Sequence, residues 1–170
     1  MSSVKHLVAQ SQGRIIDMLS DCERRIAALY GRFAAAFPLS ADFWNMLVRE
    51  EIRHAQLLEG LHSILDRGFL IHDIGRFDQE RMKEFQALLD DARQRVSSGA
   101  MDEAGAFATA LQVEHSLLES RFYAEVSSDA PEFAAVCKVM QDETEQHIAK
   151  LQAALEQETG AGLAARKQQG

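Results

Sequence analysis

Hydrophobic residues recur every three or four positions through most of the chain, the spacing that gathers them on one side of an α-helix. This spacing predicts a first long helix over residues 4–37, which Pro38 is expected to end because proline cannot continue the helical hydrogen-bond pattern. Ser40 is a suitable N-cap for a second long helix. The hydrophobic stripe of the second helix consists of Leu47, Glu51, His54, Leu58, Leu61 and Leu65. Two members of this otherwise apolar stripe are therefore polar.

Three further segments, 78–96, 102–126 and 131–158, show the same spacing, and the first of them follows a connector bracketed by two glycines. Four of the five helices are long and come as two pairs, and the connection between the pairs holds the lesser helix 78–96. This order predicts an all-α fold, a four-helix bundle with one long crossover connection containing an additional helix. We assign residues 1–160 to the bundle and residues 161–170 to a flexible C-terminal tail.

Each of the four long helices carries a carboxylate or a histidine near the middle of its stripe. In chain order these residues are Glu23, Glu51, His54, Glu114, Glu143 and His147. A buried ionised carboxylate costs several kcal/mol unless it is paired or bound to a metal, and several in one layer repel one another. A bound cation removes both penalties, so the six residues are candidate metal ligands.

Glu51 and His54 stand three positions apart, which directs an oxygen donor and a nitrogen donor from one helical turn toward the same point. Mixed carboxylate and imidazole ligation suits iron or manganese, and zinc can occupy the same kind of site. The E-x-x-H spacing alone also occurs in solvent-facing pairs. Its position on the stripe favours ligation.

These residues resemble a known family. Glu23 followed by Tyr30, the segment 50–55 (Glu-Glu-Ile-Arg-His-Ala), Glu114 and the segment 142–147 (Asp-Glu-Thr-Glu-Gln-His) together resemble the ferritin-like superfamily, specifically rubrerythrin-like di-iron carboxylate bundles. The resemblance covers nearly the whole chain. It implies that Glu23 and Glu114 are the single-helix ligands of two iron ions and that Glu51 and His54 form the first E-x-x-H pair.

The second pair departs from the family pattern. Thr144 stands three residues before His147, where the family has a bridging glutamate, so that role is unfilled unless Glu143 reaches in, for instance through a π-bulge. Leu117 occupies the position of the extra glutamate that rubrerythrins often carry, and two cysteines are too few for a rubredoxin-like domain, so we expect none. We therefore expect either two iron ions or one.

Tyr30 lies two turns from Glu23 on the same face, where it could hydrogen-bond a ligand or relay electrons as a catalytic residue, or simply fill core. Leu29, Phe33 and Leu57 are not used by a single stripe, and they favour a homodimer.

Charge and composition limit the kinds of molecule that the chain is expected to bind. The chain has 18 Lys and Arg against 26 Asp and Glu, a formal charge of -8, which disfavours nucleic acid and anionic membranes. Its two cysteines form no C-x-x-C pair, which excludes a rubredoxin-type site. No secretory signal or bilayer-spanning run is recognisable, so we expect a cytoplasmic protein.

Two functions follow from these observations. The first is a non-haem iron protein that reacts with dioxygen or hydrogen peroxide, as a rubrerythrin-like peroxidase or a ferroxidase, in oxidative-stress defence or iron handling. Its electrons would come from a separate donor or from Fe(II). The alternative is a non-catalytic helical bundle for protein interaction, with a structural metal such as zinc or with none.

Overall fold

The computed structural model describes residues 2–72, 79–119 and 127–167. Within these ranges the chain is almost wholly helical, as predicted. The elements are α1 (Ser2–Ala36), the short 3-10 helix η1 (Pro38–Ser40), α2 (Ala41–Gly60), α3 (His62–Asp66), β1 (Ile71–His72), α4 (Gln79–Ser97), α5 (Glu103–Glu119), β2 (Ser127–Ser128) and α7 (Pro131–Lys167). None of the described helices has the length and apolar content that a bilayer-spanning segment requires.

The boundary between α1 and α2 lies where Pro38 and Ser40 predicted it. Pro38 lies two residues after the end of α1, and Ser40 immediately precedes α2. The Ser40 hydroxyl, however, does not cap a backbone N–H; it accepts a hydrogen bond from Trp44 Nε1 at 3.0 Å. A serine predicted as a helix cap thus satisfies the indole of a buried tryptophan instead.

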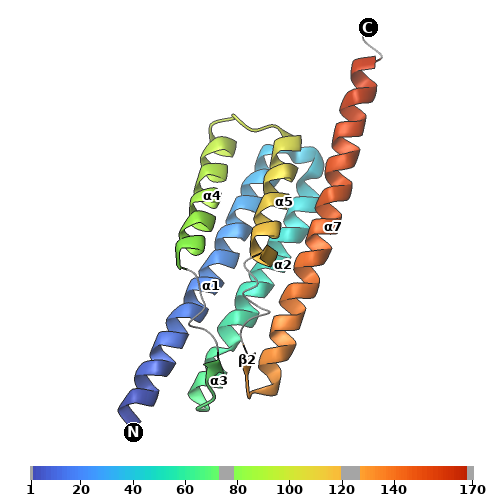
Figure 1. The fold of residues 1–170 in the computed structure, drawn as a ribbon. Coiled ribbons are helices and arrows are strands. Elements are labelled where there is room, and N and C mark those ends of the chain that lie inside the picture. Colours follow the sequence, from blue (N-terminus) through green and yellow to red (C-terminus); the bar gives the residue numbers. More distant parts are fainter. Residues whose placement is uncertain (1, 73–78, 120–126, 168–170) are drawn as a thin grey trace.

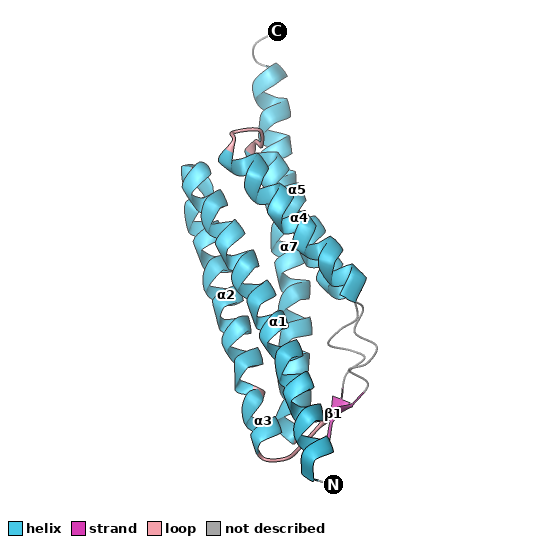
Figure 2. Ribbon diagram, turned by 90° about the vertical axis from the view of Figure 1, so that its left-hand side faces the viewer, coloured by secondary structure: helices cyan, strands magenta, loops and turns pink. Residues whose placement is uncertain are grey.

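The long helices lie side by side along most of their length (Figures 1 and 2). α1 packs along α2, and α5 packs along α7. α4 contacts both α1 and α5, and α2 also contacts α7. All six residues of the predicted stripe on the second helix are buried, although the helix is interrupted at Leu61 between α2 and α3. The helical periodicity therefore identified correctly the face that packs inward.

Two hydrophobic clusters fill the interior. One contains Tyr30, Trp44 and Phe107 together with Leu151 of α7. The other contains Leu19 of α1, Leu58 of α2, and Phe133 and Met140 of α7. On α2 and α7 the predicted polar residues stand in the sequence between members of the two clusters, and on α5 Glu114 directly follows Val113 of the first cluster. A polar layer is thus enclosed by apolar packing at both ends.

The two short strands form a feature that the sequence did not indicate. β1 pairs antiparallel with β2, with Ile71 opposite Ser128 and His72 opposite Ser127. The side chain of Gln12 on α1 is buried and bonds both polar backbone groups of Ile71: Nε2 donates to the carbonyl at 2.6 Å and Oε1 accepts from N–H at 3.0 Å. The Gln12 side chain therefore connects the N-terminal part of α1 to the crossover connection.

Two expectations about the elements need correction or remain outside the structure. α7 continues past the predicted end near residue 158 to Lys167, because Gly160 and Gly162 cost helix stability without stopping it and alanine-rich sequence follows. α5 is described only to Glu119, so the predicted extension through 120–126, with Phe122, lies outside the described residues.

Two of the three residues that favoured a homodimer are buried within the single chain. Leu29 and Phe33 are fully buried within the hydrophobic cluster of the single chain, and α4 contacts α1, the helix that carries them. These two side chains are thus part of the interior of the single chain. Dimerisation itself stays a prediction.

Candidate metal centre

Two groups of buried acidic and histidine side chains lie in the polar layer. The first contains Glu23 of α1 with Glu51 and His54 of α2, and the second contains Glu51, Glu114 of α5 and His147 of α7. In each group, one possible ligand atom from every member lies within 4.8 Å of the others. None of the five residues is more than 1% exposed. The structure therefore brings together five of the six predicted ligands, with Glu51 common to both groups.

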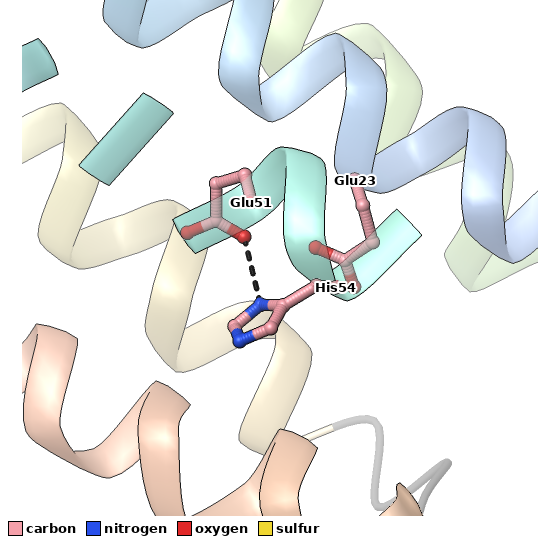
Figure 3. A group of neighbouring side chains, drawn as sticks. All are labelled: Glu23, Glu51 and His54. Atoms are coloured by element: carbon pink, nitrogen blue, oxygen red, sulfur yellow. Dashed lines mark hydrogen bonds and ion pairs between the residues drawn. The ribbon is translucent and has the colours of Figure 1, made fainter. Parts of the chain in front are cut away.

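Figure 3 shows the first group. Glu51 and His54 project from α2, and Glu23 approaches them from the neighbouring helix α1. Glu51 Oε2 lies 3.1 Å from His54 Nδ1. This short distance follows from their three-residue spacing, which places both side chains on one helical face.

The second group uses the other oxygen of Glu51. Glu51 Oε1 lies 3.0 Å from Nδ1 of His147, and the same nitrogen is 3.5 Å from Glu114 Oε1. The rings of His54 and His147 are stacked with their centroids 5.5 Å apart. Glu51 thus presents one oxygen to each histidine, as a carboxylate that bridges two metal ions would.

Several of these atoms have no hydrogen-bond partner. Glu51 Oε1, Glu114 Oε2 and His147 Nδ1 are buried and make no hydrogen bond, even though the first and last of them are only 3.0 Å apart. A buried polar atom left in this state costs about 1–3 kcal/mol. Because the atoms lie close together without pointing at one another in hydrogen-bond geometry, a cation placed among them would satisfy all three. The residues present therefore fit a metal ion.

The outer nitrogen of each histidine binds a carboxylate from the opposite helix. His54 Nε2 lies 2.6 Å from Glu143 Oε2 of α7, and His147 Nε2 lies 2.9 Å from Glu50 Oε2 of α2. A proton on each Nε2, donated to these carboxylates, leaves each Nδ1 with its lone pair directed inward. This is the tautomer that a metal ligand requires.

Each outer carboxylate is also held by a cation. Glu143 forms an ion pair with Arg53 of α2, and Glu50 lies 3.1 Å from Lys150 Nζ of α7. Glu143 and Glu50 have side-chain exposures of 24% and 28%, so they stand between the buried histidines and solvent. The two outer arrangements are reciprocal, since each joins α2 to α7.

The structure does not place Glu143 among the inner residues. Glu143 belongs to neither three-residue group; it contacts His54 from the outside instead of supplying the missing bridge. α7 is α-helical throughout Pro131–Lys167, so no π-bulge shifts Glu143 into register. In a regular helix, residues 143 and 144 point about 100° apart, and only one of them can face the centre.

Thr144 occupies the inward position. It is buried, and its hydroxyl donates to the carbonyl oxygen of Met140 at 2.8 Å. The side chain is thus engaged within its own helix, and it provides no charge opposite Glu51. Glu51 is therefore the carboxylate that the two three-residue groups share.

Sequence reasoning missed three residues of the outer layer, namely Glu50, Arg53 and Lys150. One signal was present: a glutamate stands four residues before each histidine, Glu50 before His54 and Glu143 before His147. The i, i+4 spacing suggests a contact within one helix. Each glutamate instead contacts the histidine of the other helix, which only the packing of α2 against α7 reveals.

Tyr30 contacts the centre directly. Its hydroxyl donates to Glu114 Oε1 at 2.6 Å, and both residues are fully buried. Burial and the neighbouring carboxylates Glu114 and Glu51 raise the pKa of Tyr30 well above its usual value, so its hydroxyl stays protonated. This bond leaves Glu114 Oε2 as the oxygen available to a cation.

Without a cation, the centre binds protons. Burial raises the pKa of Glu51, but the neighbouring imidazoles of His147 and His54 outweigh it and lower the pKa to about 2. Burial lowers the pKa of His147, but Glu114 and Glu51 outweigh it and raise the pKa to about 10. Burial and the charge of Glu51 raise the pKa of Glu114. A protonated histidine thus substitutes for the cation among the carboxylates.

Comparison of the chain with family models, curated proteins and solved structures gives no match. The function proposed below is therefore supported by the residues of the centre and by the resemblance of their sequence pattern.

Proposed function

We propose that the chain is a ferritin-like, rubrerythrin-like iron protein whose centre reacts with dioxygen or hydrogen peroxide. One observation carries the proposal: two buried three-residue donor groups share Glu51 and draw their members from α1, α2, α5 and α7. A single residue pair at E-x-x-H spacing occurs by chance. Two three-residue donor groups in one buried layer, with donor atoms that make no hydrogen bond, are hard to explain by packing alone.

The helix arrangement supports the ferritin-like part of the proposal. In that architecture, two helices each supply one carboxylate and the other two supply the E-x-x-H pairs. Here α1 and α5 supply Glu23 and Glu114, while α2 and α7 supply His54 and His147. α4 is then the additional helix of the crossover connection.

The donor set favours iron, with manganese or zinc able to substitute. Three carboxylates and two imidazoles provide hard oxygen ligands together with nitrogen ligands of intermediate softness. Iron held in this way supplies one-electron chemistry toward dioxygen or hydrogen peroxide. Glu50 and Glu143 keep each histidine in the metal-binding tautomer, and Tyr30 orients Glu114. The hydrophobic clusters on both sides exclude water.

The missing bridge makes the two halves unequal. Glu23, Glu51 and His54 form a complete three-donor group, while Glu114 and His147 depend on the second oxygen of Glu51. We therefore expect one tight and one weaker metal site, with slow turnover. The electrons for sustained turnover come from a separate donor or from Fe(II).

One observation favours the alternative of a structural metal. Thr144 is bonded to its own helix, so the position opposite Glu51 carries no second bridging carboxylate. A single zinc ion in a non-catalytic helical bundle fits this arrangement as well.

Anaerobic titration with Fe(II), followed by metal analysis, tests the centre itself. We expect tight binding that Glu51→Ala abolishes at both positions, because both groups need this residue. Glu145→Ala, at an exposed position on α7, is the matched control and should leave binding unchanged. Retention of the same metal content in the Glu51→Ala variant would overturn the assignment.

Consumption of hydrogen peroxide separates the two functions. Iron-loaded chain supplied with a reductant should consume peroxide, and zinc-loaded chain should not. If iron binds tightly but peroxide and dioxygen are consumed no faster than by the Glu51→Ala variant, the structural alternative replaces the catalytic one.

A further inference from the structure

A cluster of aromatic side chains begins at the metal centre. The Tyr30 hydroxyl contacts Glu114 at 2.6 Å, and the Tyr30 ring lies beside the indole of Trp44 with centroids 5.7 Å apart. Both aromatic side chains are fully buried. They come from different helices, α1 and α2, so their contact is a product of the packing.

Trp44 connects this cluster with the surface of the molecule. Its indole N–H donates to Ser40 Oγ in η1, the turn in which Leu39 is 99% exposed. The rings of Phe33 and Phe107 also contact Trp44, with centroids 4.9 and 4.7 Å away. Tyrosine and tryptophan are the aromatic side chains that give up an electron most readily, whereas phenylalanine does not do so under biological conditions. The oxidisable rings thus form one path, surrounded by rings that are inert.

We propose that Tyr30 and Trp44 form an electron relay between the metal centre and the η1 turn. The inference rests on the proposed function, because hydrogen peroxide or dioxygen at the iron-loaded centre is the oxidant. Phe33 and Phe107 have a packing role, and they keep water from the two rings. Electron transfer slows exponentially with distance, and two rings in contact lie in the fast range.

The electron and proton balance is local. When the centre has been oxidised, Tyr30 gives one electron to it, and the Tyr30 O–H bond breaks as its proton moves to Glu114 Oε1. Trp44 then gives one electron to the Tyr30 phenoxyl radical, which recovers the proton from Glu114 and reforms the O–H bond. The indole radical cation keeps its N–H, bonded to Ser40. A one-electron reductant at the surface, such as ascorbate, restores Trp44, so one electron reaches the centre without net proton transfer.

The sequence makes the relay directly observable. Trp44 is the single tryptophan of the chain, and Tyr30 is one of two tyrosines, the other being Tyr123. An indole radical therefore comes from Trp44 alone. Tyr30→Phe and Tyr123→Phe distinguish the sources of a tyrosyl radical.

The first experiment uses metal-free chain and a pulse-generated one-electron oxidant in solution. Oxidised Trp44 should take an electron from Tyr30, because the coupling between two rings acts in both directions. We expect the indole radical to decay into a tyrosyl radical at a rate independent of protein concentration, with conversion lost in Tyr30→Phe and unchanged in Tyr123→Phe. Conversion that persists unchanged in Tyr30→Phe would overturn the relay.

The second experiment mixes iron-loaded chain with hydrogen peroxide and ascorbate, and follows radicals by freeze-quench electron paramagnetic resonance. A tyrosyl radical should form in the wild type and be absent in Tyr30→Phe. In Trp44→Phe its lifetime should increase about tenfold or more, which corresponds to about 1.4 kcal/mol in activation free energy. Phe107→Leu changes the packing against the same indole without removing an oxidisable group, and it should leave the lifetime near that of the wild type.

The two experiments separate the relay from the function on which it rests. Equal lifetimes in Trp44→Phe and the wild type, in chain that consumes peroxide, would overturn the relay and leave the iron function standing. Chain that loads no iron would overturn the proposed function, and the metal-free experiment would still decide whether the two rings exchange an electron.

Discussion

Glu51 is the residue on which both halves of the candidate metal centre depend. Its two oxygens lie 3.1 and 3.0 Å from the inner nitrogens of His54 and His147. Without a metal, these contacts lower its pKa to about 2, so the carboxylate is charged at neutral pH. Thr144 provides no comparable charge on the opposite helix. We expect the distribution of charge at these two positions to control how many cations the centre can hold.

Replacing Thr144 by Glu should raise occupancy of the weaker metal site. The new carboxylate would stand at the inward position of α7 and supply the second bridge. Metal analysis after loading with Fe(II) should show a stoichiometry closer to two per chain than in the wild type. In metal-free chain the same change should lower the free energy of unfolding by several kcal/mol, because a buried charge is added without a partner.

Glu143→Ala gives the complementary measurement, because Glu143 contacts His54 only from the outside. Equal and stoichiometric binding of two irons in the wild type, unaffected by Glu143→Ala, would show that Thr144 is no deficit.

Proton binding at the same residues should make the stability of the metal-free chain depend on pH. The pKa of His147 is raised from 6.5 to about 10, so its stabilising effect is complete below pH 6.5 and lost as the pH rises toward 10. The pKa of Glu51 is lowered from 4.5 to about 2, so its effect is complete above pH 4.5 and lost as the pH falls toward 2. Urea unfolding in the presence of a chelator should therefore show highest stability between pH 4.5 and 6.5.

The alkaline decline should be smaller in His147→Gln, which cannot lose a proton from that position. Metal affinity should change in the opposite sense over the same range, because a metal must displace the proton from the inner nitrogen. A metal affinity that falls as the pH rises from 6.5 toward 10 would contradict this picture of competition between proton and metal.

At the scale of elements, polar side chains join helices that apolar packing alone would leave less firmly fixed. α2 and α7 are joined by two reciprocal contacts, from Glu50 to His147 and from Glu143 to His54. The N-terminal part of α1 is joined to β1 through Gln12, whose side-chain amide hydrogen-bonds the N–H and the C=O of Ile71. Such contacts fix the register of elements that are far apart in the sequence.

Gln12→Ala should lower the free energy of unfolding by about 1–3 kcal/mol, because it leaves the buried N–H and C=O of Ile71 without their partner. Denaturation by urea measures the change. Gln56→Ala, at an exposed position on α2, is the matched control and should change stability far less. An equal effect of the two substitutions would mean that the Gln12 amide contributes nothing beyond its helix propensity.

At the scale of the whole molecule, the polar layer lies between two hydrophobic clusters, and its donors belong to all four of the helices α1, α2, α5 and α7. A cation bound there would hold four helices at one point. It would also remove the cost of the unsatisfied atoms Glu51 Oε1, Glu114 Oε2 and His147 Nδ1. Metal binding and global stability should therefore be linked.

Saturating metal should stabilise the chain against urea by about 2.7 kcal/mol when the free metal concentration is one hundred times its dissociation constant. A chelator should reverse the effect completely. Glu51→Ala should show no stabilisation, because it removes a donor from both groups. Equal stabilisation of this variant by metal would place the binding site elsewhere on the molecule.

The amino-acid sequence by itself determined the helices and the residues that face inward. Helical geometry assigns each position to a face, and a carboxylate or histidine on an apolar stripe is recognisable without any tertiary structure. Glu23, Glu51, His54, Glu114 and His147 were identified in this way. Prolines and glycines marked most of the breaks, although glycines near the C-terminus did not stop α7.

Only the tertiary structure decided which residues contact one another across helices. It placed Glu143 on the outer nitrogen of His54, gave Glu50 the same role at His147, and buried Leu29 and Phe33 within the single chain. It also brought Trp44 against Tyr30. Periodicity reports the direction of a side chain from its own helix, but the partner depends on the axial register and rotation of a neighbouring helix, which many weak packing contacts determine together.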